Sequence, residues 1–241
     1  LDRKELARVS ALVCRRLDNV VSFTRYSVGE SRETNERHRP VAIGIQGLQD
    51  ALYITGLAWG SEQAMQLDED IMEAIYFGAM SESTQMAKEK GSYPSYHRSP
   101  AALGFLQPDL WLVEQAIRAG KLPDLPIAEL VAHHSDKLPP KWEPKRKHFD
   151  YESLRAHIAK FGLRNSEVTA PMPTASTSQI FGNTEGIEAA TSNIFRRETM
   201  SGSFVVVNEY LVKDLMELKM WNDDMVHTIV QAGGSIQDIN L

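Results

Sequence analysis

Cysteine, long apolar runs and surplus positive charge are what this sequence has least of. The 241 residues hold a single cysteine, Cys14, which excludes an internal disulfide and any metal site that needs several cysteines. No apolar run approaches the roughly 20 residues of a membrane-spanning helix. The 26 Lys and Arg against 32 Asp and Glu give a formal charge of -6, which argues against a surface built to neutralise a polynucleotide. We therefore expect a soluble cytoplasmic protein that binds no nucleic acid and no membrane.

The composition that remains is that of an ordinary globular protein. Hydrophobic residues make up 42% of the chain and charged residues 24%, and the length suffices for one large domain or two small ones. The chain opens on Leu1 without an initiator methionine and stops on the apolar Leu241. We expect it to be a segment of a longer protein.

Helix signals dominate the pattern. Behind Asp2, a good N-cap residue, apolar side chains recur at steps of three and four and predict an amphipathic helix over residues 3–24. These side chains are Leu6, Val9, Val13, Leu17 and Val20. Capping residues, terminal glycines and apolar spacing predict further helices over residues 47–57, 61–91, 110–119, 150–162, 173–181, 210–218 and 222–232.

Strand signals are shorter and fewer. Val-Ala-Ile-Gly-Ile at residues 41–45 is apolar and β-branched, as a buried strand should be, and residues 165–171 should be extended. The polar stretch 27–39 is predicted to be a connection. Residues 108–150, interrupted by six prolines and locally basic, are predicted to be a surface excursion around one short helix. Short strands that alternate with helices favour an α/β fold with a largely parallel sheet or barrel.

The segment Pro-Met-Pro-Thr-Ala-Ser-Thr at residues 171–177 best suits an anion. An extended run meets a predicted helix start of small and hydroxylated residues. Small side chains let a phosphate approach the backbone, free amides and hydroxyls can donate to it, and the helix dipole adds favourable potential. Simple N-capping by Thr174 or Ser176 explains the same residues. Spacing alone does not decide between a phosphate site and a helix cap.

Other residues with chemical potential fit structural roles better. Cys14 lies in the middle of the first predicted helix, where we expect a small core or boundary residue and not a nucleophile. The four carboxylates within residues 68–73 are expected on a solvated helix face. The adjacent histidines at 133–134 cannot share one helix face, as a helical zinc motif requires, so no metal site is predicted.

One long stretch carries a family resemblance. Gly-Leu-Arg-Asn-Ser at residues 162–166, followed by Ala-Pro-Met-Pro-Thr-Ala-Ser-Thr-Ser-Gln-Ile-Phe-Gly-Asn at 170–183, resembles the most characteristic part of class I ribonucleotide reductase large subunits. Shorter similarities in the same order extend over nearly the whole chain. They lie at residues 37–40, 44–48, 50–51, 75–76, 78–79, 99–100, 191–197, 201–204, 208, 211, 213–215 and 234–237. Departures concentrate in residues 108–150, which are longer and richer in proline than the family pattern.

The resemblance implies an α/β fold that is part of a ten-stranded barrel, built as two antiparallel sets of five parallel strands, with substantial helix. Residues 1–241 would be the C-terminal portion of that barrel domain. The implied activity is the radical reduction of ribonucleoside diphosphates to deoxyribonucleoside diphosphates for DNA synthesis. The family's redox and radical cysteines have no match here, and Cys14 aligns with an ordinary helical position. We expect no catalytic residue in this segment, which should be inactive alone.

The resemblance assigns the substrate's diphosphate to Thr174, Ala175, Ser176 and Thr177. This segment itself is expected to bind no cofactor and no metal. The full enzyme would need a radical from a small subunit, a dithiol reductant, and ATP or deoxynucleoside triphosphate effectors. Its large subunits would pair as a homodimer.

Two alternatives stay open. A noncatalytic relative of the large subunit would keep the fold as a binding scaffold, and the residues before Leu1 discriminate, because an enzyme should carry an Asn, a Cys, a Glu and a second Cys there. A stand-alone phosphate-binding module is the other alternative. It would fold and bind nucleoside diphosphates in isolation, whereas half a barrel with open strand edges should be unstable.

Overall fold

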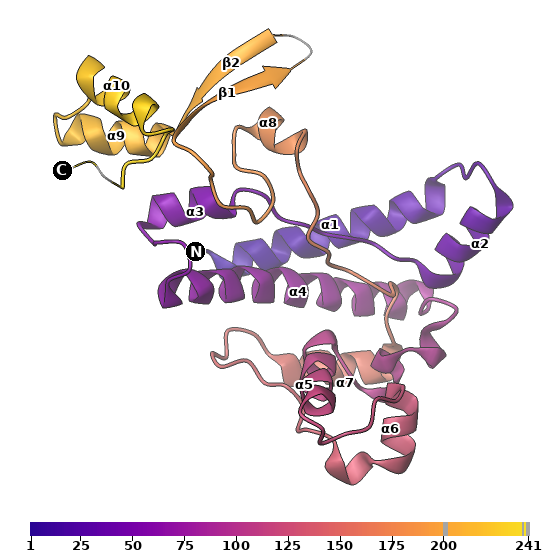
Figure 1. Cartoon of the computed structure of the whole chain (residues 1–241). Helices are drawn as coiled ribbons and strands as arrows, with labels where there is room; N and C mark the ends of the chain where they lie inside the picture. The colour runs from indigo at the N-terminus through magenta and orange to yellow at the C-terminus, as the bar shows by residue number, and fades with distance from the viewer. Residues whose placement is uncertain (200–201, 238, 240–241) are drawn as a thin grey trace. The chain divides into compact units, whose positions relative to one another are not determined.

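The computed structural model describes residues 1–199, 202–237 and 239, and helices predominate in it (Figure 1). Its α-helices are α1 (Arg3–Phe23), α2 (Gly29–His38), α3 (Leu48–Thr55), α4 (Glu62–Lys90), α5 (Gln107–Arg118), α6 (Ile127–His133), α7 (Tyr151–Phe161), α8 (Thr177–Phe181), α9 (Glu209–Glu217) and α10 (Asp223–Gln231). Short 3-10 helices are η1 (Tyr96–Arg98), η2 (Pro100–Leu103) and η3 (Ser135–Lys137), and the strands are β1 (Ile194–Thr199) and β2 (Gly202–Val207).

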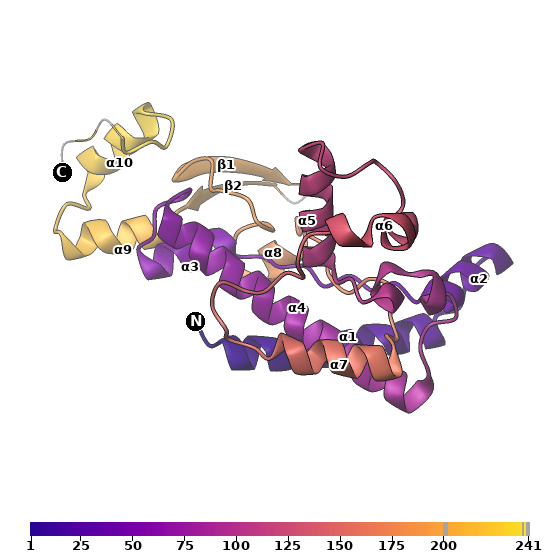
Figure 2. The same ribbon diagram turned by 90° about the horizontal axis from the view of Figure 1, so that it is seen from below.

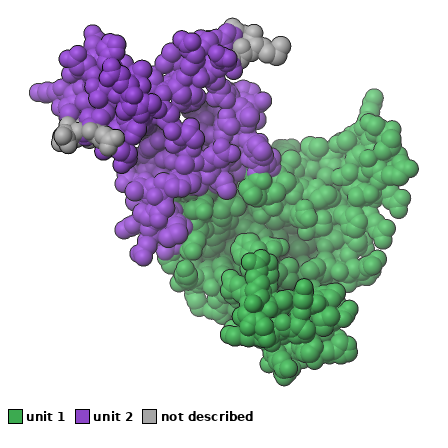
Figure 3. Space-filling model, viewed as in Figure 1, with its two compact units in different colours: residues 1–44, 67–171 green, residues 45–66, 172–241 purple. Residues whose placement is uncertain are grey.

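The chain divides into two compact units, coloured separately in Figure 3. Unit 1 comprises residues 1–44 and 67–171, and unit 2 comprises residues 45–66 and 172–241. Unit 1 therefore contains α1, α2, α5, α6, α7 and most of α4. Unit 2 contains α3, α8, the two strands and the last two helices. Ser201 of the resemblance and the terminal Leu241 lie outside the described residues.

The pair of helices α1 and α4 is the centre of unit 1, and the two run side by side in both ribbon views (Figures 1 and 2). They approach closely because Gly78 of α4 has no side chain. A Cβ atom at Gly78 would lie only 2.1 Å from the carbonyl oxygen of Ala7. Nearby, the Ser10 hydroxyl donates to the Ile75 carbonyl over 2.7 Å. Small residues thus bring the two backbones into direct contact.

The buried face of α1 is not the predicted one. The helix and its Asp2 cap are confirmed, since the Asp2 carboxylate accepts from the Glu5 amide. The buried residues, however, lie one position after the predicted apolar stripe, and they are Ala7, Ser10, Cys14, Asp18 and Val21. Val9 and Val20 of the predicted stripe are exposed. The close approach to α4 favours small side chains, and polar residues on this face find partners there, so burial does not follow hydrophobicity.

Helix ends were the best predicted local feature. Asp150, Asn208 and Asn222 each accept a backbone amide in the first turn of α7, α9 and α10, as expected from the sequence. α3 and α4 also occupy their predicted segments, and the predicted helix at 110–119 is α5. The three capping side chains accept from first-turn amides that have no acceptor within the helix itself.

Two predicted connections have more structure than expected. The polar stretch 27–39 was predicted as a connection, but ten of its residues form α2. No residue of α2 is buried, so hydrophobic spacing gave no signal. The exposed pair Arg32 and Glu36, one turn apart, adds a small stabilisation to the helix. Residues 108–150 hold most of α5, α6 and η3. Val113, Leu122 and Leu130 of this stretch form a small core together with Phe105, which precedes it. That this stretch is a surface excursion of a barrel domain stays a prediction.

Strands are much fewer than the expected barrel requires. In the predicted strand 41–45, Val41 and Ile43 are buried as predicted, but among the described residues this segment forms only an isolated parallel bridge, from Ile43 to Thr169. The segment around Thr169 runs beside residues 41–43 for only a few residues, so the pairing does not extend into a ladder. The expectation of a largely parallel sheet is wrong for the described residues, and they do not confirm the ten-stranded barrel.

The one sheet within the described ranges is an antiparallel pair that the sequence analysis did not anticipate. Its β-branched residues favour strand, and Phe204 and Val205 of β2 are exposed. The cross-strand partners are Ile194 with Val207, Phe195 with Val206, Arg196 with Val205, Arg197 with Phe204, Glu198 with Ser203 and Thr199 with Gly202. Across the described parts of the chain, no helix combines the length and the apolar character needed to cross a bilayer.

The contact between α1 and α4 generates a stability prediction. Gly78→Ala should lower the free energy of unfolding by about 1–3 kcal/mol, because the added methyl group meets backbone that no side-chain rotation can move. Thermal or urea unfolding measures the loss. The matched control is Gly29→Ala at the start of α2, where an added Cβ meets nothing within 4 Å and the change should stay within about 1 kcal/mol. Equal stability of the two variants would contradict the packing described.

Candidate functional site

The four residues assigned to the diphosphate lie at the start of α8 in unit 2. Thr174 is half-buried, whereas Ala175, Ser176 and Thr177 are exposed. The helix predicted over residues 173–181 begins only at Thr177 and has five residues. We call residues 174–177 the cradle.

Side-chain capping does not account for the cradle. Ser176 occupies the N-cap position of α8, but its side chain makes no capping hydrogen bond. The Thr174 hydroxyl accepts instead from the Gly186 amide, over 2.7 Å. Within the described residues, the amides of Ala175, Ser176 and Thr177 donate to no acceptor. Neither Thr174 nor Ser176 therefore caps α8 with its side chain, so the capping interpretation is wrong. Three consecutive backbone amides remain without an acceptor in the described part of the chain.

A loop after α8 fixes one end of the cradle. Gly186, which holds Thr174, follows Thr184, whose amide and hydroxyl both donate to the Asp50 carboxylate, over 2.7 and 2.6 Å. The Thr184 carbonyl in turn accepts from the Gly47 amide, over 2.9 Å. Gly47 has φ +80°, a conformation that favours glycine, and it places α3 against this loop. The family-like stretch at residues 44–48 thus supports the cradle.

The other end of the cradle contacts Gln46. The Thr177 hydroxyl donates to the Gln46 side-chain oxygen over 2.8 Å. Gln46 directly precedes Gly47, so the same turn supports both ends of the cradle. Sequence analysis missed Gln46 because only the fold brings positions 46 and 177 together.

The cradle is electrically neutral. Between Glu167 and Glu185 no residue carries a formal charge at neutral pH. Glu185 is paired with Arg197 over 3.0 Å. An anion here would meet backbone amides and hydroxyls. The acidic groups that support the same loop are engaged, Asp50 by the Thr184 amide and hydroxyl and Glu185 by Arg197.

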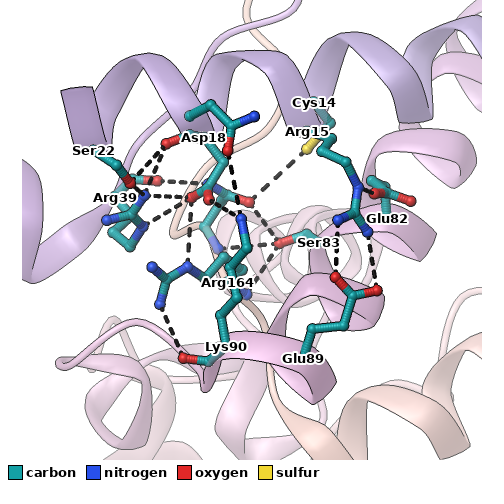
Figure 4. A network of polar contacts seen from close by, with 12 residues as sticks. Cys14, Arg15, Asp18, Ser22, Arg39, Glu82, Ser83, Glu89, Lys90 and Arg164 are labelled. Atoms are coloured by element: carbon teal, nitrogen blue, oxygen red, sulfur yellow. Dashed lines mark hydrogen bonds and ion pairs between the residues drawn. The ribbon is translucent and has the colours of Figure 1, made fainter. Parts of the chain in front are cut away.

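A second polar cluster, in unit 1, contains other residues of the family-like motifs (Figure 4). Its centre is Asp18, fully buried on α1. The Arg39 side chain donates to its carboxylate over 2.8 Å, Arg164 lies 3.5 Å from it, and Lys90 lies 3.7 Å from its other oxygen. Three cations therefore converge on one buried carboxylate. Burial and the neighbouring Arg39 charge lower the pKa of Arg164, while Asp18 opposes them.

Asn165 ties this cluster to α4. Its amide group donates to Asp18 over 3.2 Å and to the Arg39 carbonyl over 3.1 Å, while its oxygen accepts from the Ser83 hydroxyl over 3.0 Å. Arg39 has a left-handed backbone, with φ 47°, at the end of α2. We call Asp18, Arg39, Asn165 and Arg164 the Asp18 cluster. Its contacts lie wholly within the protein, so its role is to hold α1, α4 and two loops together.

Cys14 lies beside this cluster as a core residue, as predicted. It is fully buried, and its thiol points toward the Asn165 oxygen at 3.9 Å. Burial, helped by the charges of Glu82 and Asp18, raises the pKa of the thiol to about 12. A thiol in this state is a poor nucleophile.

One carboxylate of the predicted solvated face is buried. Asp70 is 3% exposed and pairs with Arg3 and Arg146, so the expectation for residues 68–73 is wrong at this position. Burial would raise the pKa of Asp70, but hydrogen bonds from the two guanidinium groups outweigh burial and hold the pKa below its ordinary value. Within the described residues, no group of three or more His, Cys, Asp or Glu side chains could hold a metal ion.

The Asp18 cluster predicts a large cost for removing its central charge. Asp18→Asn keeps the shape but leaves buried cations uncompensated, and it should lower the free energy of unfolding by about 3–5 kcal/mol. Denaturant unfolding measures the change. Glu5→Gln is the control, because its pair with Arg8 is exposed and should contribute at most about 1 kcal/mol. A small loss at Asp18 would show that the cluster does not bear on stability.

Burial of Cys14 predicts slow alkylation in the native protein. At pH 8 a thiol with a pKa of about 12 is almost entirely protonated, and it is also inaccessible. Iodoacetamide should therefore label Cys14 slowly in the folded state and rapidly in denaturant, as followed by peptide mass spectrometry. Fast native labelling would contradict the packing described.

Comparison with known proteins agrees with the motifs. The family model described as ribonucleotide reductase, barrel domain, matches residues 1–241. The ribonucleoside-diphosphate reductase large subunit of Trypanosoma brucei brucei is 42% identical over 238 residues, which is 99% of this chain and 26% of that protein. The large chain from Neurospora crassa is 39% identical over 99% of this chain and 22% of its own length. The Arabidopsis thaliana large subunit is also 39% identical, over 99% of this chain and 26% of its own length.

This chain therefore spans about a quarter of the length of the relatives it matches. The family model, by contrast, covers the chain from its first residue to its last. The motifs that suggested the resemblance lie inside this matched range. On these grounds the chain belongs to the ribonucleotide reductase large-subunit family and falls within the family's barrel domain.

Proposed function

We propose that this chain supplies the substrate-phosphate site of a ribonucleoside-diphosphate reductase. The complete protein would reduce ribonucleoside diphosphates to deoxyribonucleoside diphosphates for DNA synthesis by a radical mechanism. The named relatives are large subunits of ribonucleoside-diphosphate reductases, and this supports the activity. Catalytic thiols would lie outside this chain, because Cys14 is buried and protonated.

The observation that carries the proposal is the row of uncapped amides in the cradle. Ala175, Ser176 and Thr177 present three successive N–H groups, and no side chain larger than threonine stands in the cradle. Backbone amides and hydroxyls are suitable donors for phosphate oxygens. Asp50, through the loop that contains Thr184, and Gln46 hold the two ends, so the donors are arranged before a ligand arrives. Such a fixed grip on the diphosphate would position the ribose for reaction.

The wider requirements of the enzyme are part of the same proposal. A small subunit would deliver the radical, a dithiol would supply the reducing electrons, and ATP or deoxynucleoside triphosphates would act as effectors. The large subunits would form a homodimer in the cytoplasm. These requirements are the ones that membership of the family implies.

The proposal predicts a change in the Michaelis constant. In the complete enzyme, replacing Ser176 and Thr177 together by Ala removes two of the hydroxyl groups assigned to the diphosphate. Each hydrogen bond to a charged group contributes about 1.5–3 kcal/mol, so KM for a ribonucleoside diphosphate should rise roughly tenfold or more.

Thr228→Ala is the matched control for this double variant. The Thr228 hydroxyl is exposed on α10 of the same unit and bonds only to the Asp224 carbonyl of its own helix. The KM of the Thr228→Ala enzyme should equal that of the parent enzyme. An unchanged KM in the Ser176 and Thr177 variant would overturn the phosphate assignment.

A further inference from the structure

The two threonines of the cradle use their hydroxyl groups in opposite ways. Thr174 accepts a hydrogen bond from the Gly186 amide, and its own proton donates to no acceptor in the described part of the chain. Thr177 donates its proton to the Gln46 side-chain oxygen, over 2.8 Å. A hydroxyl has one proton to donate. Thr174 is therefore ready to donate to an anion, and Thr177 is not.

Gln46 differs from the other groups that support the cradle. Asp50 can only accept, and the Gly186 and Gly47 amides can only donate. A glutamine amide carries an acceptor oxygen and a donor NH2 group at one end of the side chain, and rotation about its last bond exchanges them. After that rotation the NH2 group would donate to the Thr177 oxygen, and the Thr177 proton would be released from Gln46. Another acceptor within its reach, the Thr174 carbonyl, lies at the longer distance of 3.4 Å.

The surroundings leave room for this exchange. Gln46 is half-buried, and its hydrogen bond to Thr177 is exposed. The backbone beside it is fixed, because the Gly47 amide is bound to the Thr184 carbonyl and Asp50 holds the same loop. Only the side chain has to move.

We propose that Gln46 is a positioning residue of the phosphate site, which holds the Thr177 hydroxyl and, by rotation of its amide, releases the Thr177 proton to a phosphate oxygen of the substrate. This inference rests on the proposed function of the cradle. It adds a residue that contacts no substrate atom but determines whether one of the cradle's hydroxyls donates.

The test is a double-mutant cycle in the complete enzyme with its small subunit and a dithiol reductant. Thr177→Val removes the hydroxyl and keeps the shape, Gln46→Leu removes the amide, and Gln46→Glu leaves a group that only accepts when ionised. KM for a ribonucleoside diphosphate should rise about tenfold in Thr177→Val, about threefold to tenfold in Gln46→Leu, and most in Gln46→Glu, which also adds negative charge. The kcat values should change less than the KM values.

Coupling distinguishes positioning from a general structural effect. In the Thr177→Val background, Gln46→Leu should raise KM by less than about twofold, because the hydroxyl that Gln46 controls is gone. Inorganic pyrophosphate, used as a competitive inhibitor, should show the same pattern in its inhibition constant. Gln231→Leu, on the exposed end of α10 in the same unit, is the control and should leave KM unchanged.

The outcomes separate this inference from the function on which it rests. If Thr177→Val leaves KM unchanged, the Thr177 phosphate contact fails and this inference fails with it. If Thr177→Val raises KM but neither Gln46 variant does, only the role of Gln46 is overturned. An equal effect of Gln46→Leu in both backgrounds also overturns it, because Gln46 would then act without Thr177.

Discussion

A single buried negative charge organises unit 1. Asp18 has no access to solvent, and a carboxylate in that position is tolerable only when cations and hydrogen-bond donors surround it. Those partners come from segments far apart in the sequence: Arg39 ends α2, Lys90 ends α4, and Arg164 and Asn165 follow α7. Surrounding one carboxylate with these partners therefore fixes where four segments meet, and apolar packing adds stability around that point.

In unit 2, three backbone amides of the cradle lack partners among the described residues. Around the cradle the amides of residues 175–177 are left without acceptors, in a stretch that carries no formal charge between Glu167 and Glu185. Supporting groups such as Asp50 and the Gly186 amide bind the edges of the cradle and leave its centre open. The Asp18 cluster turns its charged groups toward one another inside unit 1, as a structural cluster does. Backbone donors without acceptors beside bonded supports are typical of a binding site.

Local signals in the sequence predicted the helices well and the contacts between them poorly. Caps such as Asp150 and Asn222 act within one turn, so their effect is visible in the sequence. Burial on α1 depends on what α4 presents, and Gly78 together with the partners of Asp18 moved the buried face by one residue. The cradle was found through its motif. Its partner Gln46 was not, because a contact across 131 residues leaves no local pattern.

The absence of a side chain at Gly78 has a consequence for how this protein can vary. Where side chains separate two helices, a larger residue on one can be matched by a smaller residue on the other. Here the obstacle to a larger residue is the carbonyl oxygen of Ala7, which every amino acid possesses. No substitution at position 7 removes that oxygen. A larger residue at position 78 of α4 therefore cannot be compensated by a substitution on α1.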